Sequence, residues 1–390
     1  MIIDCDSHIM PRNAFAHAAA KFPSRAPVLQ FDDTNLFVDL TFSENPAVEM
    51  PGATPLPVKH GSHGLSYRGN SDLDARLADY DRMGVDAHFA LPQLTGWWNY
   101  LIKPDLAVAI AHSWNLALLD MMRQHPSQVL GVALLPLQDV EASIREARWA
   151  KAEGFPAVLM DYVYPVAEHP YGTTLASHPE LWPLFATIEE LGLPIFLHAV
   201  QHGHRVLNVP RFTAHGLDLC APSDSQLNLV SLITSGLLDD FPQLKMIHAE
   251  TGTAYIKSLA QLMDARFEHV PIRFDEEGFT SGSRRRANAT FQELREVPPT
   301  IMREKNKQYP SHYFRNNFYW TIETEEAELA DVVQFLGAER FLFATDYPHN
   351  DPGGRMKFQD VELLRDNPRI TDTDKEAIRT TNAQALFSLG

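Results

Sequence analysis

Eight short apolar runs, separated by stretches with helical patterning, constrain the fold of this chain more than any other feature. The runs lie at residues 2–6, 85–91, 129–135, 157–161, 193–198, 244–249, 318–321 and 341–345. This alternation is the sequence pattern of parallel βαβ units. Eight such units in 390 residues predict an α/β fold, specifically a (β/α)₈ TIM barrel, because such barrels commonly reach this length by carrying insertions.

The clearest helix-strand unit is SHPELWPLFATIEELGLPIFLH, which spans residues 177–198. Ser177 and Glu180 have the spacing of a capping box at a helix start. The apolar residues that follow recur at helical spacing: Leu181, Leu184, Phe185, Ile188 and Leu191. Gly192 is placed to end this helix just before the next strand.

Two intervals are too long for the connections of a minimal barrel. Residues from about 23 to 71 are rich in Pro, Asn, Gly and Ser, and residues from about 271 to 310 contain the basic run SRRRANAT. We interpret both as insertions near the barrel mouth, which cover the active site or form an oligomer contact. Plain surface excursions are the alternative. Residues 1–390 are expected to form one domain.

Charge and composition restrict the partners of the chain. A formal net charge of -17 disfavours nucleic acid and anionic membranes, so a small-molecule substrate is expected. Cys5 and Cys220 are the only cysteines, which argues against a disulfide framework. The first residues lack a secretory pattern, and no apolar run approaches the roughly 20 residues of a membrane span. We therefore expect a cytoplasmic protein.

Polar residues of metal-binding types mark the first apolar run. Asp4, Asp6 and His8 are spaced by two, so on a regular strand they would share one face. Active sites of barrels lie at the carboxyl ends of the strands, where carboxylate and imidazole groups suit a divalent metal. A hydrogen-bonded strand end is the alternative explanation for this triplet.

Similar residues end three other runs. His198 closes LPIFLH, Asp346 follows FLFAT, and His248 and Glu250 alternate within KMIHAETG. Each residue alone has an ordinary structural explanation, such as a satisfied strand end or a helix N-cap. Together they stand at the ends of strands one, five, six and eight, which converge on one barrel mouth. The sequence therefore predicts a metal site at that mouth.

These segments also resemble a known family. IDCDSH, LWPLFATIEELGLPIFLH, LLDDFPQLKMIHAETG and FLFATDYPH resemble, in this order, the amidohydrolase-related family that includes aminocarboxymuconate-semialdehyde decarboxylase, a branch of the amidohydrolase superfamily. By position, the resemblance implies four metal ligands: Asp6, His8, His198 and Asp346. The family often has His where Asp6 stands. Its catalytic His after strand six corresponds to Glu250, with His248 two residues earlier.

The resemblance and the ligand types leave the metal open. Zn, Mn or Fe would suit these ligands, as one ion per chain or as two. A two-ion site would draw on a larger set, with His248 as a further option: Asp6, His8, His198, Glu250 and Asp346. No phosphate loop or dinucleotide fingerprint indicates an organic cofactor. Family members commonly associate, so a homo-oligomer is expected, and a hetero-oligomer is compatible with the sequence.

Several reactions fit this constellation. Hydrolysis of a small carbonyl or carboxylate compound by metal-activated water is our first hypothesis, because Glu250 replaces the usual His. Asp346 would then relay a proton, His248 would protonate the leaving group or stabilise the oxyanion, and Glu250 would act as base or ligand. The alternatives are non-oxidative decarboxylation of an aromatic or unsaturated acid, a dinuclear iron or iron/manganese oxygenase, and a catalytically inert subunit of a complex.

Overall fold

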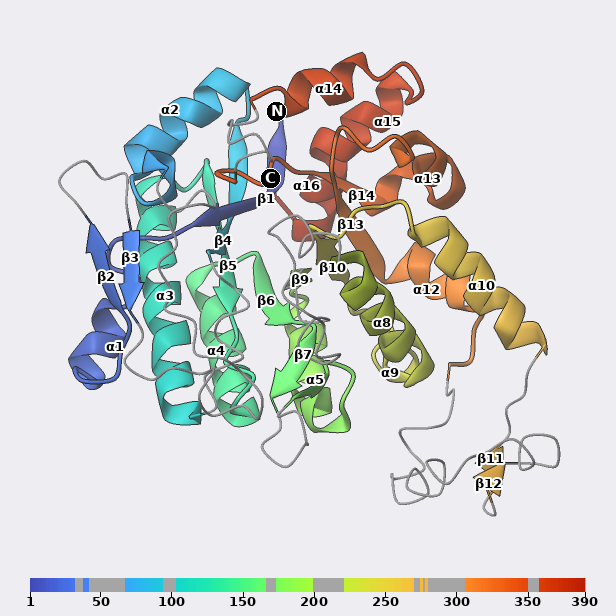
Figure 1. Ribbon diagram of the computed structural model, residues 1–390, viewed down its shortest axis with the longest axis horizontal. Coiled ribbons are helices and arrows are strands. Elements are labelled where there is room, and N and C mark those ends of the chain that lie inside the picture. The colour runs from blue at the N-terminus through green and yellow to red at the C-terminus, as the bar shows by residue number, and fades with distance from the viewer. Residues whose placement is uncertain are drawn as a thin grey trace.

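Eight parallel strands form a barrel in this computed structural model, as the sequence predicts (Figure 1). The structure describes residues 1–31, 38–41, 67–93, 103–165, 173–198, 221–269, 274–275, 278–279, 306–349 and 358–389. The strands follow one another around the sheet in chain order: β1 (Ile3–Ile9), β4 (Ala87–Pro92), β5 (Val129–Leu134), β6 (Ala157–Asp161), β9 (Ile195–His198), β10 (Met246–Ala249), β13 (Phe318–Ile322) and β14 (Phe341–Phe343). A parallel bridge between Ser7 and Tyr347 joins the last strand region to the first.

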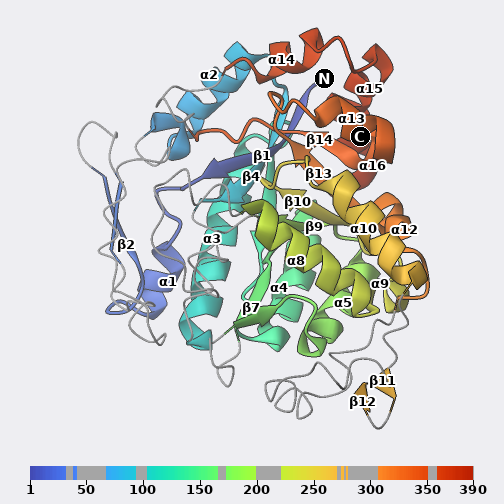
Figure 2. The ribbon, with the colours of Figure 1, turned by 45° about the vertical axis from the view of Figure 1, so that its right-hand side comes forward.

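Helices lie between successive strands and surround the barrel (Figures 1 and 2). The main ones are α2 (Leu73–Met83), α3 (Pro104–Gln124), α4 (Val140–Glu153), α5 (Trp182–Leu191), α8 (Ala221–Thr234), α10 (Ile256–His269), α12 (Pro310–Asn316) and α13 (Leu329–Leu336). Each of the eight predicted apolar runs overlaps one barrel strand. The predicted (β/α)₈ architecture is therefore confirmed.

Shorter elements complete the described chain. They are α1 (Ala16–Lys21), β2 (Val28–Phe31), β3 (Val38–Thr41), η2 (Arg68–Asn70), β7 (Val163–Pro165), β8 (Thr173–Leu175), η4 (Pro179–Leu181), α9 (Leu237–Asp240), β11 (Phe274–Asp275), β12 (Gly278–Phe279), η7 (Ala338–Arg340), α14 (Asp360–Asp366), α15 (Asp372–Glu376), η8 (Ala377–Thr381) and α16 (Asn382–Phe387). The first predicted insertion contains the antiparallel pair β2 and β3, and the second contains β11 and β12. Most of both insertions lies outside the described residues.

Helix α5 shows which local predictions succeed. Leu184, Phe185 and Ile188 of its apolar stripe are buried and Leu191 is partly buried, and Gly192 ends the helix in a left-handed conformation with φ of 62°. The predicted capping box is wrong, because α5 begins at Trp182 after a short 3₁₀ turn. The Ser177 hydroxyl bonds instead to Ser231, and the His178 ring accepts the Glu180 N–H at 3.4 Å.

The core fills the barrel and the layer between the strands and helices. Barrel strands are buried on both faces, which explains why they read as continuous apolar runs. Phe387 of α16 packs its ring against Phe89 and Phe196, with centroids 4.2 and 5.8 Å apart. The Thr380 hydroxyl donates to the Met1 carbonyl, so the two ends of the chain lie together. Among the described helices, none has the length and apolar character to cross a membrane.

Candidate metal centre

A β-bulge in β1 separates the acidic residues that open the chain. Asp4 is in register with His88 on β4, whereas Ser7 is in register with Ala90, so β1 holds one extra residue between these pairs. The extra residue interrupts the alternation of side chains, because a strand has a period of two. The prediction that Asp4, Asp6 and His8 share one face is therefore wrong: Asp4 lies apart from the other two.

Asp4 is a structural link between β1, β14 and α2. Its carboxylate accepts hydrogen bonds from the Tyr80 hydroxyl at 2.8 Å and from the Thr345 N–H and hydroxyl at 3.0 and 2.6 Å. The Asp6 N–H donates to it at 3.1 Å. Burial raises the pKa of Asp4 to about 6, although these four hydrogen bonds act to lower it.

Asp6, His8 and His198 form the centre of a second, different group. The Nε2 atoms of the two histidines are 3.0 Å apart, and each lies 3.7 Å from Asp6 Oδ1. All three side chains are buried. Asp6 Oδ1 has no hydrogen-bond partner within the part of the chain that the structure describes. A buried carboxylate oxygen without a donor beside two imidazole nitrogens is the arrangement that a metal ion satisfies.

Glu250 and Asp346 bring two more carboxylates to this group. Glu250 Oε2 lies 3.2 Å from His198 Nε2 and 4.0 Å from His8 Nε2, and Asp346 Oδ1 lies 3.3 Å from His8 Nε2. Neighbouring ligands in an octahedral shell of radius about 2.1 Å are roughly 3 Å apart. The five side chains predicted as ligands therefore lie in two overlapping groups that share His8: Asp6 and His198 belong to one, and Glu250 and Asp346 to the other, with the ligand atoms of each group within 4.8 Å of one another. We call Asp6, His8, His198, Glu250 and Asp346 the inner cluster.

The two outer carboxylates of the inner cluster have strained backbones. Glu250 and Asp346 have φ values of 53° and 52°, and Ser388 is the only other described non-glycine residue with positive φ. The left-handed conformation costs such residues about 1–2 kcal/mol each. Strain of this kind persists where surrounding contacts hold it, commonly at functional sites. Both residues stand just past the ends of their strands, so the backbone turns there as the side chains enter the cluster.

His248 is not brought to the inner cluster. It pairs in register with Leu197, one position away from the pair formed by Ala249 and His198. Its ring packs against Tyr162, and its Nδ1 lies 2.8 Å from the Ser225 hydroxyl. Burial lowers the pKa of His248 to about 3, so the ring is neutral. The alternation of side chains along a strand does not place His248 and Glu250 on one face, because β10 ends at Ala249 and the chain turns at Glu250.

Two side chains next to Asp346 extend the cluster. His349 Nδ1 lies 2.8 Å from Asp346 Oδ1, and the His349 ring stacks on His8 with centroids 4.5 Å apart. Gln93 Nε2 lies 2.8 Å from His349 Nε2. No sequence pattern indicated Gln93, since an amide side chain just after a strand is common.

The charges of the inner cluster favour a bound cation. Burial, and then the charges of Asp346 and Asp4, raise the pKa of Asp6 well above its usual value. Burial and the charge of His349 lower the pKa of His8, which keeps its ring neutral and able to coordinate. Burial opposes ionisation of Asp346, but His349 and His8 outweigh it and hold its pKa low. These donors therefore fit a divalent metal ion.

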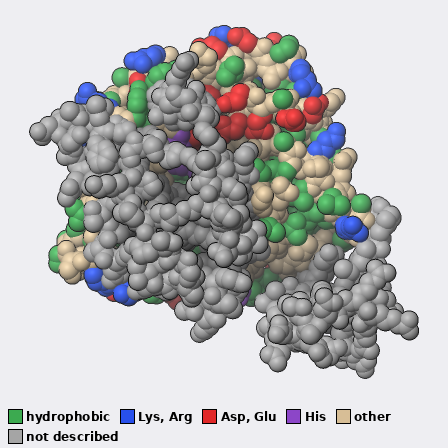
Figure 3. All heavy atoms as spheres, viewed as in Figure 1, with side chains coloured by type: hydrophobic (Ala, Val, Ile, Leu, Met, Phe, Trp, Pro, Cys, Tyr) green, Lys and Arg blue, Asp and Glu red, His purple; other side chains and the backbone are tan. Residues whose placement is uncertain are grey.

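Acidic side chains gather on one face of the molecule. Figure 3 shows them gathered between α14 and β14, with histidine side chains visible beside them. Residues Glu323, Glu325, Glu326 and Glu328 follow β13 in the sequence. The charge of Glu323 also contributes to the raised pKa of Asp6. This face would attract cations toward the cluster.

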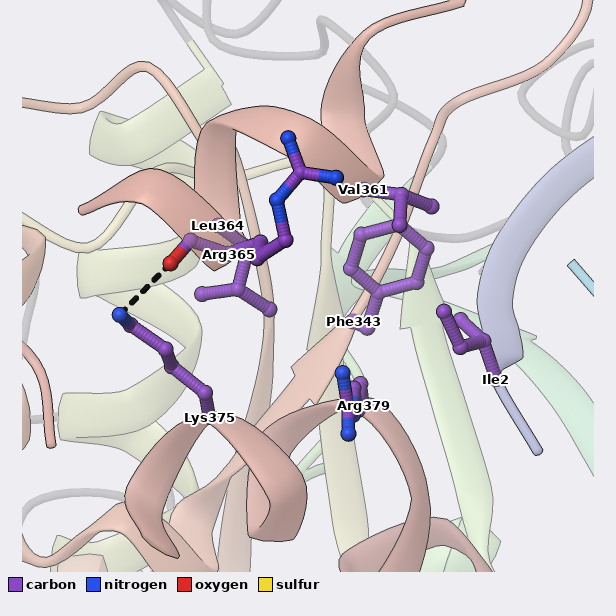
Figure 4. A pocket seen from close by; sticks show the side chains of 7 residues that line it. All are labelled: Ile2, Phe343, Val361, Leu364, Arg365, Lys375 and Arg379. Atoms are coloured by element: carbon purple, nitrogen blue, oxygen red, sulfur yellow. Dashed lines mark hydrogen bonds between the residues drawn. The ribbon is translucent and has the colours of Figure 1, made fainter. Parts of the chain in front are cut away.

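A separate small cavity lies among β1, β14 and the C-terminal helices (Figure 4). Ile2 and Phe343 form part of its apolar wall, and three basic side chains border it. Each of these is already engaged: Lys375 Nζ donates to the Arg365 carbonyl at 2.7 Å, Arg365 pairs with Asp366, and Arg379 pairs with Glu376. The cavity therefore presents no unpaired charge for an anion.

Comparison with known proteins places this geometry in a family. The amidohydrolase family model matches residues 3–389. A 2-amino-3-carboxymuconate-6-semialdehyde decarboxylase from Dictyostelium discoideum is 24% identical over 323 residues, covering 82% of this chain and 77% of that protein. A gamma-resorcylate decarboxylase from Rhodococcus jostii (strain RHA1) is 25% identical over 299 residues, covering 73% and 78%.

A solved structure shares the fold along its whole length. The dihydroxybenzoic acid decarboxylase from Polaromonas sp. JS666, with bound manganese and the inhibitor 2-nitroresorcinol, has a TM-score of 0.63 and 19% identity, covering 100% of this chain and 97% of that one. Together with the matched family model and the named relatives, the barrel identifies the chain as an enzyme, a hydrolase or a decarboxylase. The chain belongs to the amidohydrolase family.

Proposed function

We propose that this enzyme is a metal-dependent, non-oxidative decarboxylase of a small aromatic or unsaturated carboxylic acid. One observation carries the proposal: the ligand atoms of Asp6, His8 and His198 lie within 4.8 Å of one another, and the buried Asp6 Oδ1 has no hydrogen-bond donor among the described residues. The named activities of the curated relatives support decarboxylation over hydrolysis, which the sequence alone had favoured. Asp6, His8, His198 and Asp346 are the proposed ligands.

A divalent ion bound there would chelate substrate oxygens and stabilise negative charge as carbon dioxide departs. The carbon–carboxylate bond breaks, its electron pair stays on the substrate carbon, and that carbon must then receive a proton. His248 is buried outside the cluster, and the low pKa of Asp346 keeps it ionised. Glu250 remains: its side chain is 30% exposed and lies beside His198. We assign the proton to the Glu250 carboxyl group.

The number of ions is proposed as one. Ligand atoms of Asp6, His8 and His198 form one group within 4.8 Å, and those of His8, Glu250, Asp346 and His349 form another. His8 belongs to both groups, which favours a single shared ion over two separate ones. A measured ratio of two ions per chain would instead assign Glu250 and His349 to a second ion and would reopen the oxygenase hypothesis.

The first experiment measures metal content and carbon dioxide release. Protein purified without chelators is analysed for Mn, Fe and Zn, then supplied anaerobically with hydroxybenzoic acids and unsaturated dicarboxylic acids. We expect about one divalent ion per chain and stoichiometric carbon dioxide without oxygen uptake. A metal-free protein would refute the metal site. Hydrolysis of ester or amide derivatives of these acids, with no carbon dioxide released from the free acids, would support hydrolysis, for which Glu250 in place of the usual His is the specific observation.

Glu250→Gln separates the two roles that the sequence allowed for this residue. Gln has nearly the same shape but cannot release a proton, so turnover should fall at least about 100-fold while metal content stays near one ion. Asp240→Asn, which changes an exposed carboxylate on α9, is the matched control. Full turnover in Glu250→Gln would show that Glu250 is not the proton donor, and loss of the ion would identify Glu250 as a ligand.

A further inference from the structure

Strand β13 contributes no side chain to the inner cluster, yet Thr321 on this strand contacts two of its members. The Thr321 hydroxyl lies 3.3 Å from Asp6 Oδ2 and 3.1 Å from the backbone nitrogen of Glu250. Thr321 is buried, so water does not compete for these bonds. One hydroxyl group therefore joins the ends of strands β1, β10 and β13.

The direction of these hydrogen bonds follows from the groups involved. The Glu250 N–H can only donate, so the Thr321 oxygen accepts it. The single hydroxyl proton of Thr321 is then left for Asp6 Oδ2, which accepts it. This bond occupies Oδ2 and leaves Oδ1 as the oxygen that faces His8 and His198. Thr321 thus selects the carboxylate oxygen that meets an ion.

The second bond bears on the backbone of Glu250. At φ of 53° this residue is held in a conformation that L-residues seldom adopt, and its carboxylate reaches His198 from there. The N–H that donates to Thr321 belongs to the same strained residue. Loss of this acceptor would remove one of the contacts that hold Glu250 in this conformation.

We propose that Thr321 is a positioning residue of the metal centre, which orients the Asp6 carboxylate and fixes the turn at Glu250. The proposal rests on the metal site described under Proposed function. Hydrogen-bond partners of metal ligands typically change metal affinity by about 10- to 100-fold when removed. A hydroxyl that served only the packing of β13 would leave metal affinity unchanged.

The test compares Thr321→Val, which keeps the shape and removes the hydroxyl, with Thr321→Ser, which keeps the hydroxyl. Affinity for Mn²⁺ is measured by calorimetric titration of the metal-free full chain, and the geometry of the bound Mn²⁺ by its electron paramagnetic resonance spectrum. We expect Thr321→Val to weaken Mn²⁺ binding about 10- to 100-fold and to alter the spectrum. Thr321→Ser should bind within about threefold of wild type.

Thr187→Val is the matched control, because it removes another buried threonine hydroxyl, which donates to the Pro183 carbonyl within α5. It should bind Mn²⁺ as wild type does. Wild-type affinity and spectrum in Thr321→Val, or equal weakening in Thr321→Ser, would overturn the positioning role. If Thr321→Val does not fold, Thr321→Ala is compared with Thr321→Ser by the same criteria. Absence of Mn²⁺ binding in wild type would instead refute the proposed function itself.

Discussion

Asp4 and Asp6 are two residues apart on β1 and equally buried, but their surroundings are opposite. Asp4 accepts four hydrogen bonds, from Tyr80, from Asp6 and twice from Thr345. Asp6 turns one oxygen toward His8 and His198 with no donor among the described residues. The β-bulge between them sends one carboxylate to a hydrogen-bonded network and the other to the inner cluster.

The network around Asp4 is organised by a buried arginine. Arg76 of α2 is fully buried and donates to the His8 carbonyl at 2.7 Å, the Ser7 hydroxyl at 2.5 Å and His88 Nε2 at 2.9 Å. Its guanidinium also lies over the Tyr347 ring. This network therefore anchors the backbone of β1 from behind, while the inner cluster retains unsatisfied groups and strain. The hydrogen-bonded polar groups around Arg76 thus stabilise the barrel, whereas the buried groups of the inner cluster without partners are placed to bind an ion.

The largest expected effect separates metal binding from folding. His198→Ala should weaken binding of a divalent ion by about 10³-fold, or roughly 4 kcal/mol, because a structural metal site gains about this much from each ligand. The free energy of unfolding without metal should stay within about 1 kcal/mol of wild type. Titration with Mn²⁺ and urea unfolding in chelator measure the two quantities. Exposed His312→Ala is the control, and undiminished Mn²⁺ affinity in His198→Ala would contradict the site.

The next largest expected effect is a loss of stability when the hydrogen-bond network around Arg76 is broken. Arg76→Met keeps the apolar stem but leaves the His8 carbonyl, the Ser7 hydroxyl and His88 Nε2 without their donor. At about 1–3 kcal/mol for each buried group, stability should fall by at least about 3 kcal/mol. Arg82→Met, on the exposed side of the same helix, should change stability by less than about 0.5 kcal/mol. Urea unfolding of both variants in chelator measures the two free energies of unfolding. Equal values would show that Arg76 does not stabilise the barrel through this network.

The sequence predicted the barrel well because most of its strands are short, largely apolar runs, such as Val129–Leu134 and Phe341–Phe343. Buried parallel strands produce such runs whatever their connections contain. The grouping of the side chains of the inner cluster was also predicted, since His198 ends β9 and Asp346 lies shortly after β14, whereas their role as metal ligands, which the resemblance implies, stays a prediction. The sequence pattern alone placed His and acidic residues at the carboxyl ends of the barrel strands.

The failures have local physical causes. Alternation predicted one face for Asp4 and Asp6, but a bulge of one residue leaves no mark in the sequence. Alternation also predicted that His248 and Glu250 share one face, although the left-handed turn at Glu250 ends the regular strand between them. Thr321 gave no signal because a threonine in a buried strand is ordinary, and only the fold brings it to Asp6.

A smaller effect depends on pH and also tests the network. Burial and the charge of Arg76 hold the pKa of His88 well below its ordinary value of 6.5, and its Nε2 accepts from Arg76 only when the ring is neutral. Below pH 6.5 the unfolded chain gains a proton at His88 that the folded chain excludes. This residue alone should therefore reduce stability by about 1.4 kcal/mol per pH unit as the pH falls.

His88→Gln should flatten the pH dependence of stability by that one proton between about pH 6 and 4.5, because its amide oxygen can still accept from Arg76. Urea unfolding in chelator at several pH values measures the slope, with His312→Gln as the control at an exposed site. A variant curve parallel to wild type would show that His88 takes up its proton in the folded protein, and that the network tolerates a second buried cation.

The smallest expected effect has the opposite sign. In chelator, Asp6→Asn should raise the free energy of unfolding by roughly 1 kcal/mol, because it removes a buried carboxylate that burial and the charge of Asp346 disfavour. Asp4→Asn should lower it, since the new amide nitrogen cannot accept from Thr345. With Mn²⁺ present the ranking of wild type and Asp6→Asn should reverse, because only wild type gains binding energy. If Asp6→Asn were destabilised in chelator as strongly as Asp4→Asn, both carboxylates would be structural, and the contrast between the two sides of β1 would disappear.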